Sequence, residues 1–580
     1  MVSIDIKSVL SRCSFLETMA VCEYRNYEKQ HYKIAYRAKL IINKEKTVPI
    51  VICVPEKWYR DLIDIYVENY NEIDFIPHID SKGKICLFDL EGVLIDQNIQ
   101  GILIESLVRA KDILEKGFSR TNVEDFLVEF ELYWGQLPKH RFLKFDVPVS
   151  EASQTIKCTF ERTPQRKKEK QSEYFKRMYS TIIYAGKDSE ILKKWNLEKA
   201  SIINAAYFIV SPNMNIFPPD IRKELSIEYL NNLLKWVSPK ESSDILLKLH
   251  SNRVIIFAIK QPRGNTNFVG FYIEGGRLEK ENDRYWFNDV GVLQPLEVHR
   301  ADKNFLMMRT AQPNEDTNKK ILVIGCGSIG GYLIWELVKS GFEDLMIVDD
   351  DLLSEENIFR HLLGMEYVSK YKCVAIEEYI RKNIPKVSIK SLAEKCEEAV
   401  LEGDIDLEEY DMVISATGNH NLNRWINSYI FNNKISVPVI YAWNEVYGIG
   451  NHIAYFKYGN EGCYDCIFGR ADQTGELYDK SSYCKSGQEI VQSAGGCGKT
   501  YVPYGDTISL KTVLLCLDVV RKVFSGKLET NLLVSMKGDD SFFRAQGLET
   551  SGRFFRQKEN IKILTGNQIL NTECGVCGDN

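Results

Sequence analysis

Apolar and polar segments alternate most regularly in the C-terminal part of the chain, from about residue 315 onward. Short apolar runs predict buried strands, and they alternate with segments whose apolar residues recur at helical spacing. The expected strands are 320–325, 344–349, 411–416 and 436–442, and the expected helices are 328–340, 367–382 and 421–432. This order predicts a largely parallel sheet with right-handed crossovers and a ligand at the carboxyl ends of its strands.

The pattern upstream predicts two further blocks. The first has helical spacing over 8–23 and strand-like runs at 31–42 and 48–54. A glycine-containing turn then leads to KICLF at 84–88, and helices are expected over 98–116 and 122–135. A polar, proline-containing stretch around 150–170 predicts a boundary. The next block mixes a helix-like segment, Ile221–Trp236, with strand-like ones, Arg253–Ile259 and Asn267–Ile273, and carries no recognisable chemical motif. We therefore expect an α/β protein of three domains, 1–148 (α+β), 149–312 (mixed α/β) and 313–580 (Rossmann-like).

Composition narrows the class of protein. The content of 44% hydrophobic and 27% charged residues is that of a globular protein, and the net charge of −6 argues against general binding of nucleic acid. No apolar run is long enough to predict a membrane span, and the N-terminus does not resemble a secretory signal. Fifteen cysteines without secretion favour reduced thiols, metal ligands or nucleophiles over disulfides. We expect a cytoplasmic protein.

A glycine-rich turn follows the first predicted C-terminal strand. The sequence ILVIGCGSIGG at 321–331 places Gly325, Gly327 and Gly330 between a strand and a helix, a spacing that predicts a nucleotide-binding turn. Three aspartates, 349–351, end the next strand, and Asn357, Arg360 and Lys372 follow. A polar and cationic set at the phosphate end favours chemistry on ATP over hydride transfer.

Two cysteine pairs predict a metal site. Cys463 and Cys466 form one C-x-x-C motif, and Cys574 and Cys577 form another at the far end of the chain. Each pair can occupy two corners of a tetrahedron, so together they predict a closed Zn²⁺ site. Because such a site has no open coordination position, we expect the zinc to be structural.

In this order, the glycine turn, the acids, the N-x-x-R motif, the later lysine and the cysteine pairs resemble the ThiF and ubiquitin-activating-enzyme family over about residues 315–580. Its members adenylate the C-terminal carboxylate of a small protein with ATP and Mg²⁺. The resemblance implies that the three glycines line the phosphate turn and that Asp349 holds the ribose. It also implies that Asn357, Arg360 and Lys372 surround the triphosphate, where the two cations would stabilise developing charge.

Two positions depart from this family pattern. His361 stands where the family usually has glutamine after the arginine. Thr417-Gly418-Asn419 stands where a Thr-Asp-Asn motif is assigned to magnesium, and Gly418 has no side chain with which to bind a metal. Asp351, another acid, or phosphates and waters would then hold the Mg²⁺.

A family member that passes its substrate onward needs a thiol outside the sheet. Cys497, in SAGGCGKTYVPYG, has glycines that allow close approach and a lysine that could favour the thiolate. We expect Cys497 to be this thiol, with Cys484 as the alternative, whereas Cys516 lies among apolar residues typical of a core.

The first block resembles ubiquitin-conjugating enzymes. The stretch Asp80–Leu87, DSKGKICL, is similar to their active-site turn, and EFELYW at 129–134 is similar to bacterial conjugating-enzyme-like domains. By this resemblance Cys86 would accept the activated chain as a thioester and pass it to an amine. His78 stands where the asparagine of their His-Pro-Asn motif would support the oxyanion, so it would donate a hydrogen bond or act as a base.

The three blocks in this order are similar to the ubiquitin-transferase-like proteins of bacterial CBASS antiphage operons. That resemblance implies a substrate, the C-terminus of a partner cyclic-oligonucleotide synthase (CD-NTase), which would be joined to cellular targets. It also implies a homodimer formed through the activating domain.

Three other functions stay open at this point. An adenylyltransferase for a sulfur-carrier protein would need neither a conjugating thiol nor the long N-terminal region. A nucleotide-binding redox protein would not need the cationic set or the cysteine pairs. A non-catalytic nucleotide-binding adaptor is compatible with Gly418 and with the missing His-Pro-Asn motif.

Overall fold

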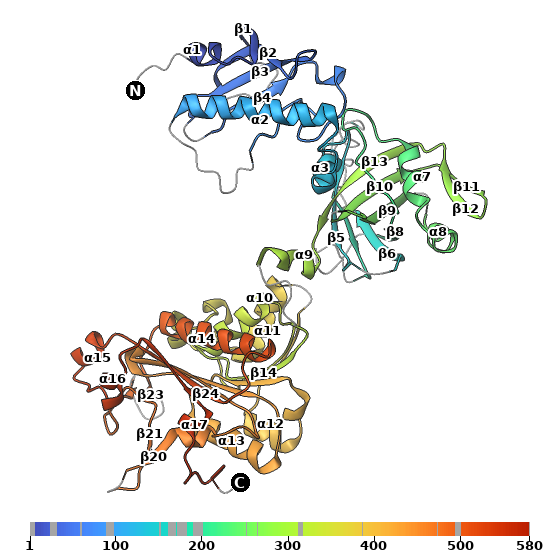
Figure 1. Cartoon of the computed structure of the whole chain (residues 1–580). Coiled ribbons are helices and arrows are strands. Elements are labelled where there is room, and N and C mark those ends of the chain that lie inside the picture. The colour runs from blue at the N-terminus through green and yellow to red at the C-terminus, as the bar shows by residue number, and fades with distance from the viewer. Residues whose placement is uncertain are drawn as a thin grey trace. The chain divides into compact units, whose positions relative to one another are not determined.

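Two units make up the computed structural model, Met1–Leu306 and Met307–Asn580. Figure 1 shows the elements of each. The structure describes residues 6–23, 32–58, 61–88, 98–149, 152–160, 170, 182–189, 201–250, 252–263, 265–310, 317–384, 387–471, 474–493 and 500–578. Within these ranges no helix has both the length and the apolar character needed to cross a membrane.

The first unit begins with a four-stranded antiparallel sheet in the order β1-β2-β3-β4. Its strands are Leu16–Cys22, Tyr32–Ile41, Thr47–Pro55 and Asp64–Val67, and they are accompanied by helices α1 (Ile6–Ser11) and α2 (Ile99–Ser119). Helix α2 lies along one face of the sheet in Figure 1, and its residues Leu103, Leu107 and Leu114 share one apolar core with side chains of the sheet.

One expected helix in this region was wrong. The helical spacing over 8–23 covers α1 and then β1, which pairs with β2 from Leu16 to Cys22. The register of β1 shifts between Glu17 and Ala20, an irregularity that places apolar residues at intervals similar to those of a helix. Pairing with β2 therefore overrides the local period.

A closed seven-stranded barrel forms the rest of the first unit, in the order β10-β13-β5-β7-β6-β8-β9. Its strands, in chain order, are β5 Arg141–Asp146, β6 Gln154–Phe160, β7 Ile183–Gly186, β8 Ile202–Val210, β9 Asn252–Lys260, β10 Thr266–Glu274 and β13 Val292–Arg300. Alternate residues of β9 enter two different cores: Val254 and Ile256 lie in one, Ile255 and Phe257 in the other. The second core also contains α7 (Ile227–Leu234) and α8 (Pro239–Leu246), so β9 is apolar on both faces.

Two short helices connect these parts of the first unit, α3 (Asp125–Val128) and α4 (Phe130–Gly135). Phe126, Phe130 and Trp134 are buried in the core that the barrel shares with α7 and α8. A hairpin of β11 (Arg277–Glu281) and β12 (Arg284–Asn288) extends from the barrel.

The second unit contains an eight-stranded sheet in the order β16-β15-β14-β17-β18-β19-β24-β25. The strands are β14 Lys320–Ile324, β15 Asp344–Val348, β16 Ser388–Leu392, β17 Met412–Ser415, β18 Val439–Asn444, β19 Gly450–Phe456, β24 Leu532–Lys537 and β25 Ile561–Thr565. The first five strands in the sheet order are parallel, as predicted, and the last three are antiparallel additions.

Helices cover both faces of this sheet. α10 (Gly330–Lys339), α11 (Lys372–Asn383) and α14 (Asp506–Phe524) share one core, and α12 (Cys396–Glu402) and α13 (His420–Asn433) share the other. The helix expected from 367 begins at Lys372, because Met365–Tyr367 forms a separate 3₁₀ turn and Tyr371 bridges to Leu352. The architecture is the expected Rossmann-like one, and the ligand edge lies at the ends of β14, β15 and β17.

Candidate functional site

A cavity of about 470 Å³ lies at the carboxyl ends of β14, β15 and β17, within the usual size range of small-molecule sites. All the predicted nucleotide residues except Gly330 line it: Gly325, Gly327, Asp349, Asp351, Asn357, Arg360 and Lys372. The topology has therefore brought together side chains from a stretch of almost fifty residues. Ser328, Glu394, Lys395 and Tyr504 also line the cavity, and the sequence had not singled them out.

Close packing inside the turn explains two of its glycines. Gly325 has φ +90°, and a Cβ there would lie 2.9 Å from Thr417 Cγ2. A Cβ on Gly330 would lie 1.8 Å from the carbonyl oxygen of Gly325, so Gly330 is required by the turn and not by the ligand. Around Gly327, among the described residues, no atom lies within 4 Å of such a Cβ, and this position opens onto the cavity.

Asp349 organises the main chain of the turn. One carboxylate oxygen accepts a hydrogen bond from the Cys326 N–H at 2.6 Å, and the other accepts from the Asp351 N–H at 2.9 Å. Burial raises the pKa of this carboxyl above its ordinary value. Its position at the end of β15 suits the predicted contact with a ribose, although here its bonds are to backbone groups.

Lys372 forms an ion pair inside the cavity. Its Nζ lies 2.7 Å from Asp351 Oδ2, and its N–H donates to the Asp351 carbonyl at 2.9 Å. The lysine side chain is only 11% exposed, whereas that of Asp351 is 69% exposed. A nearly buried ammonium is thus held by a carboxylate that remains accessible to a cation.

Asn357 and Arg360 lie on the 3₁₀ segment Glu355–Arg360. Asn357 Oδ1 accepts hydrogen bonds from the N–H and the hydroxyl of Ser354, both at 3.2 Å, so the amide nitrogen is the end left to donate. Arg360 donates to the Val502 carbonyl at 3.4 Å, and its guanidinium lies 5.5 Å from the Tyr504 ring centroid. The cation is therefore placed by a loop more than a hundred residues downstream.

His361 links the glycine turn to this segment. The Leu363 N–H donates to Nδ1 at 3.1 Å, which makes Nε2 the protonated nitrogen, and Nε2 donates to the Cys326 carbonyl at 2.7 Å. Burial lowers the pKa of the imidazole, so it is neutral. A glutamine amide could donate the same bond, which explains how histidine substitutes for it.

The Thr417-Gly418-Asn419 segment leads into α13. Gly418 has φ +67°, in the left-handed region, and Asn419 caps the helix by accepting from the Asn421 and Leu422 N–H groups. No side chain at 418 reaches the cavity, but the acids Asp350, Asp351, Glu394 and Glu397 line it. Asp351 is thus well placed for the cation role that Gly418 lacks.

The four cysteines of the two C-x-x-C motifs converge in the second unit. Their sulfurs lie within 4.8 Å of one another. The Sγ–Sγ distance is 3.9 Å for Cys463–Cys466, 3.6 Å for Cys463–Cys574 and 3.3 Å for Cys466–Cys577. A tetrahedron with Zn–S bonds of ~2.3 Å has edges of about 3.8 Å, so the donor set fits zinc in identity and spacing.

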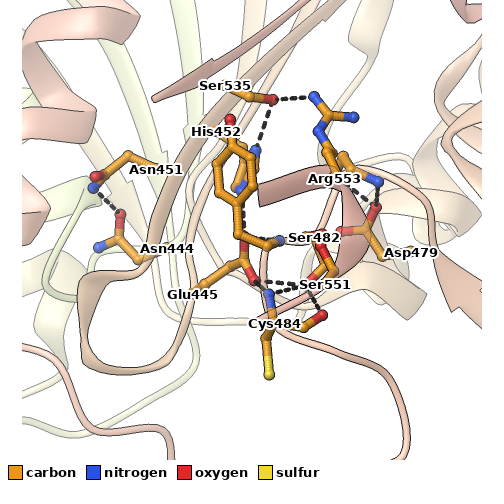
Figure 2. A network of polar contacts seen from close by, with 12 residues as sticks. Asn444, Glu445, Asn451, His452, Asp479, Ser482, Cys484, Ser535, Ser551 and Arg553 are labelled. Atoms are coloured by element: carbon orange, nitrogen blue, oxygen red, sulfur yellow. Dashed lines mark hydrogen bonds and ion pairs between the residues drawn. The ribbon is translucent and has the colours of Figure 1, made fainter. Parts of the chain in front are cut away.

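Cys484 lies beside a buried polar network, and Figure 2 shows its sulfur pointing away from that network. Glu445 accepts hydrogen bonds from the Cys484 N–H at 2.8 Å and from the Tyr483 N–H at 2.7 Å, and it lies 2.7 Å from His452 Nε2. Burial raises the pKa of the Cys484 thiol to about 11. Cys484 is therefore poorly suited to act as a nucleophile in this conformation. Cys497, the thiol predicted first, lies outside the described residues.

Cys86 lies in the first unit on an exposed turn. Its N–H donates to the His78 carbonyl at 2.8 Å, and Ile85 bridges to Ile79 on the facing strand of the turn. The structure thus presents the thiol residue at a surface position that a protein partner can reach.

The His78 side chain is placed differently from what the motif predicts. Nδ1 lies 3.0 Å from Glu129 Oε1, and Nε2 lies 3.0 Å from Asp125 Oδ2. The Glu129 carboxylate, aided by that of Asp125, raises the pKa of His78 to about 9 against the opposing effect of burial. An imidazolium with both nitrogens bound to carboxylates is not a base, and in this conformation it does not offer an N–H to an oxyanion.

Comparisons with known proteins agree with both halves of this picture. Residues 307–560 match the ThiF family, and residues 15–143 match the prokaryotic E2 family B. The ATP-dependent ubiquitin transferase-like protein Cap2 of Pseudomonas aeruginosa is 29% identical over 291 residues, which cover 48% of this chain and about half (51%) of that protein. Its namesake in Escherichia coli is 23% identical over 569 residues, which cover 88% of this chain and 89% of that protein.

Two further similarities cover less than half of this chain. The adenylyltransferase and sulfurtransferase UBA4 of Candida albicans is 23% identical over 45% of this chain and 52% of its own length. The crystal structure of Escherichia coli MccB is 20% identical, with a TM-score of 0.33, over 46% of this chain and 66% of that one. One polypeptide thus matches the ThiF family in one region and the prokaryotic E2 family B in another, so the resemblance predicted from the motifs is confirmed.

Proposed function

We propose that this chain is an ATP-dependent enzyme that activates the C-terminal carboxylate of a protein and transfers it, through thiols, to a target amine. The observation that carries the proposal is the pairing of a nucleotide cavity built by the ThiF domain with an exposed cysteine, Cys86, in an E2-type domain. Each domain supplies one half of an activation and transfer reaction.

The cavity suits ATP with its phosphates toward the glycine turn. The N–H groups of the turn and the amino end of α10 favour the phosphates, and Asp349 lies where a ribose would be held. Lys372 and Arg360 would offset the charge that builds up as a carboxylate oxygen bonds to the α-phosphorus and pyrophosphate leaves. Asp351, already paired with Lys372, would hold the accompanying Mg²⁺.

A second cavity of about 990 Å³ supports a peptide substrate. It shares Asn357, Arg360 and Tyr504 with the nucleotide cavity, so the two cavities adjoin at these residues. Aromatic and apolar residues line much of the remainder, Tyr447, Tyr501, Pro503 and Phe542, together with the acids Glu355 and Glu356. An extended C-terminal segment lying there would direct its carboxylate toward Arg360, while Glu355 and Glu356 would favour a basic residue in that segment.

The remaining steps use thiols. Cys497 would attack the acyl adenylate and release AMP, Cys86 would take the acyl group by thioester exchange, and an amine would displace Cys86 to form an amide. The four cysteines Cys463, Cys466, Cys574 and Cys577 would hold a structural Zn²⁺ that ties the C-terminal segment to the domain. The resemblance to CBASS proteins indicates a CD-NTase C-terminus as the substrate, and a homodimer through the activating domain.

A thiol-adduct assay tests the proposal. The full chain is incubated with ATP, Mg²⁺ and a CD-NTase carrying its native C-terminus, and products are separated on non-reducing gels. We expect a thiol-labile adduct between the chain and the CD-NTase. Cys86→Ala should alter this adduct, and Cys497→Ala should abolish formation of the first thioester. Cys484→Ala is the matched control and should leave the adduct intact. An adduct that survives both Cys86→Ala and Cys497→Ala would refute the relay.

The same assay separates the alternatives. Pyrophosphate release without a thioester would favour an adenylyltransferase for a sulfur carrier. The absence of both, with nucleotide still bound, would favour an adaptor. Arg360→Ala should abolish pyrophosphate exchange if the protein is an adenylyltransferase, and it should have no catalytic consequence if the protein is an adaptor.

A further inference from the structure

The barrel of the first unit contacts the turn that carries Cys86 at two separate places. One contact is made by Arg222, which lies between β8 and α7 on the barrel side. Its Nη1 donates to the carbonyl oxygens of Tyr70 and Ile73, each at 2.8 Å. These two residues begin the segment 70–86, which we call the thiol loop, and which ends at Cys86.

Asp220 holds the Arg222 guanidinium in place. Nε donates to Asp220 Oδ1 and Nη2 donates to Oδ2, both at 2.7 Å, so the two side chains form a bidentate ion pair. The arginine side chain is 12% exposed, and its guanidinium lies 4.9 Å from the Tyr70 ring centroid. An arginine that is nearly buried, oriented by a carboxylate and bonded to two carbonyls is much more restrained than a surface residue.

The second contact runs through α3 and α4. On the side facing the thiol loop, Asp125 and Glu129 bind the two ring nitrogens of His78, and the Tyr133 hydroxyl accepts from the His78 N–H at 2.6 Å and donates to Glu129 at 2.7 Å. His78 has φ 63°, a conformation that these bonds compensate. The carbonyl of this same residue accepts the Cys86 N–H.

On their other side, α3 and α4 are bonded to barrel strands. The Trp134 indole donates to the Leu296 carbonyl on β13 at 2.9 Å, and Glu131 accepts from the Phe268 N–H on β10 at 2.7 Å. A buried amide, Asn267 on β10, donates to the Leu127 carbonyl at 3.2 Å. A continuous series of bonds thus runs from the barrel wall through His78 to the backbone of Cys86.

We propose that the barrel is part of the conjugating site, and that Arg222 and His78 are positioning residues that hold the thiol loop in the conformation that presents Cys86. His78 performs this role as a cation shared by two carboxylates rather than as an oxyanion donor or base. The block without a chemical motif of its own is then a support for the thiol. This inference rests on the proposed function of Cys86.

Hydrogen exchange on the full chain, without ATP or partner, tests the inference. Arg222→Ala should speed exchange of peptides covering 70–86, the Cys86 amide included, by at least about tenfold, while Arg222→Lys recovers part of the protection. Lys240→Ala is the control: this exposed residue lies on α8, also between β8 and β9 in the chain, and its replacement should leave the region 70–86 unchanged. Faster exchange confined to the barrel, with 70–86 unchanged, would overturn the inference.

A pH profile distinguishes positioning by His78 from a general loss of stability. Protection of the Cys86 amide, corrected for the intrinsic exchange rate, should fall in the wild type as pH rises through the His78 pKa of about 9. The isosteric Glu129→Gln removes the largest cause of that raised pKa, so the fall should move to lower pH. Asp125, Tyr133 and Lys116 are the other titratable groups around this pair. An unmoved profile would overturn the role of His78.

These readouts are independent of catalysis. If exchange behaves as expected but no thioester forms in the gel assay, the proposed function fails and the structural coupling stands. If thioester forms normally in Arg222→Ala and exchange over 70–86 is unchanged, the inference fails and the proposed function stands.

Discussion

The cysteine cluster of the second unit joins two distant parts of the chain, and a metal bound there should stabilise the folded state. Cys463 and Cys574 are 111 positions apart, with their sulfurs at 3.6 Å. A cross-link through a metal lowers the conformational entropy of the unfolded chain. For a closed loop of this length, the dependence of cross-link stabilisation on loop length predicts a gain of about 5 kcal/mol in the free energy of unfolding. We therefore expect Cys574→Ser/Cys577→Ser, which detaches the C-terminal segment, to destabilise the second unit by up to this amount.

For domains of 150–250 residues, each kcal/mol corresponds to about 2–4 °C in Tm. The double variant should thus melt below the wild type by up to about 10–20 °C. Stripping zinc with a strong chelator should have the same effect on the wild type and little on the variant. Elemental analysis should find about one zinc per wild-type chain. Cys22→Ser, at another cysteine of intermediate exposure, is the control and should leave Tm unchanged.

Two outcomes would refute this reasoning. One is a wild-type chain that holds no stoichiometric metal yet melts cooperatively with the second unit intact. The other is a double variant that binds no zinc but keeps the wild-type Tm, because the cross-link through the four cysteines would then contribute nothing to stability.

Three further predictions concern single residues. Gly330→Ala should weaken ATP binding by at least about tenfold in a calorimetric titration, because its Cβ would lie 1.8 Å from the Gly325 oxygen, whereas Gly364→Ala, which has open space around it among the described residues and does not line the nucleotide cavity, should bind ATP nearly normally; equal losses would contradict the packing argument. His361→Gln should keep the bond to the Cys326 carbonyl, whereas His361→Ala should lower the free energy of unfolding by about 1–3 kcal/mol in denaturant titrations, and identical values for the two variants would count against that bond. Because the His78 pKa is raised from 6.5 to about 9, its contribution to stability should be complete below pH 6.5 and disappear as pH rises through 9, so the Tm difference between the wild type and His78→Gln should shrink between pH 7 and pH 10, and a constant difference would rule out titration of His78.

Local patterns predicted the parts of the fold that depend on local order. The four strands and three helices predicted between Lys320 and Asn444 were confirmed, because those strands are apolar runs and those helices repeat at their own period. The parallel strand β16 (Ser388–Leu392) and the helix α12 (Cys396–Glu402) were missed, and β16 has polar residues that hide it. The antiparallel strands β19, β24 and β25 were missed, since their partners lie far away in the chain. The region 8–23 was taken for one helix because the register irregularity of β1 imitates a helical period.

The residues of the candidate site likewise fall into those that local sequence predicted and those that it did not. The glycine turn, the acids, Asn357, Arg360 and Lys372 follow one another within about fifty residues, and their spacing alone indicated a nucleotide site. Tyr504, which contacts Ser328 and Arg360, comes from a distant loop that no local signal connects to the turn. The roles of Cys86 and Cys497 as thioester carriers stay predictions, the second outside the described residues.

By itself, the sequence determined which chemical groups the chain carries and, through glycine spacing and paired cysteines, which ligands they suit. Only the tertiary structure decided where those groups are directed. The motif suggested that His78 would serve an oxyanion, but folding places two carboxylates around its ring, Asp125 of α3 and Glu129 between α3 and α4, and makes it a cation. The reason is physical: a residue's charge and its bonds are set by the groups packed against it, and most of those groups come from elsewhere in the chain.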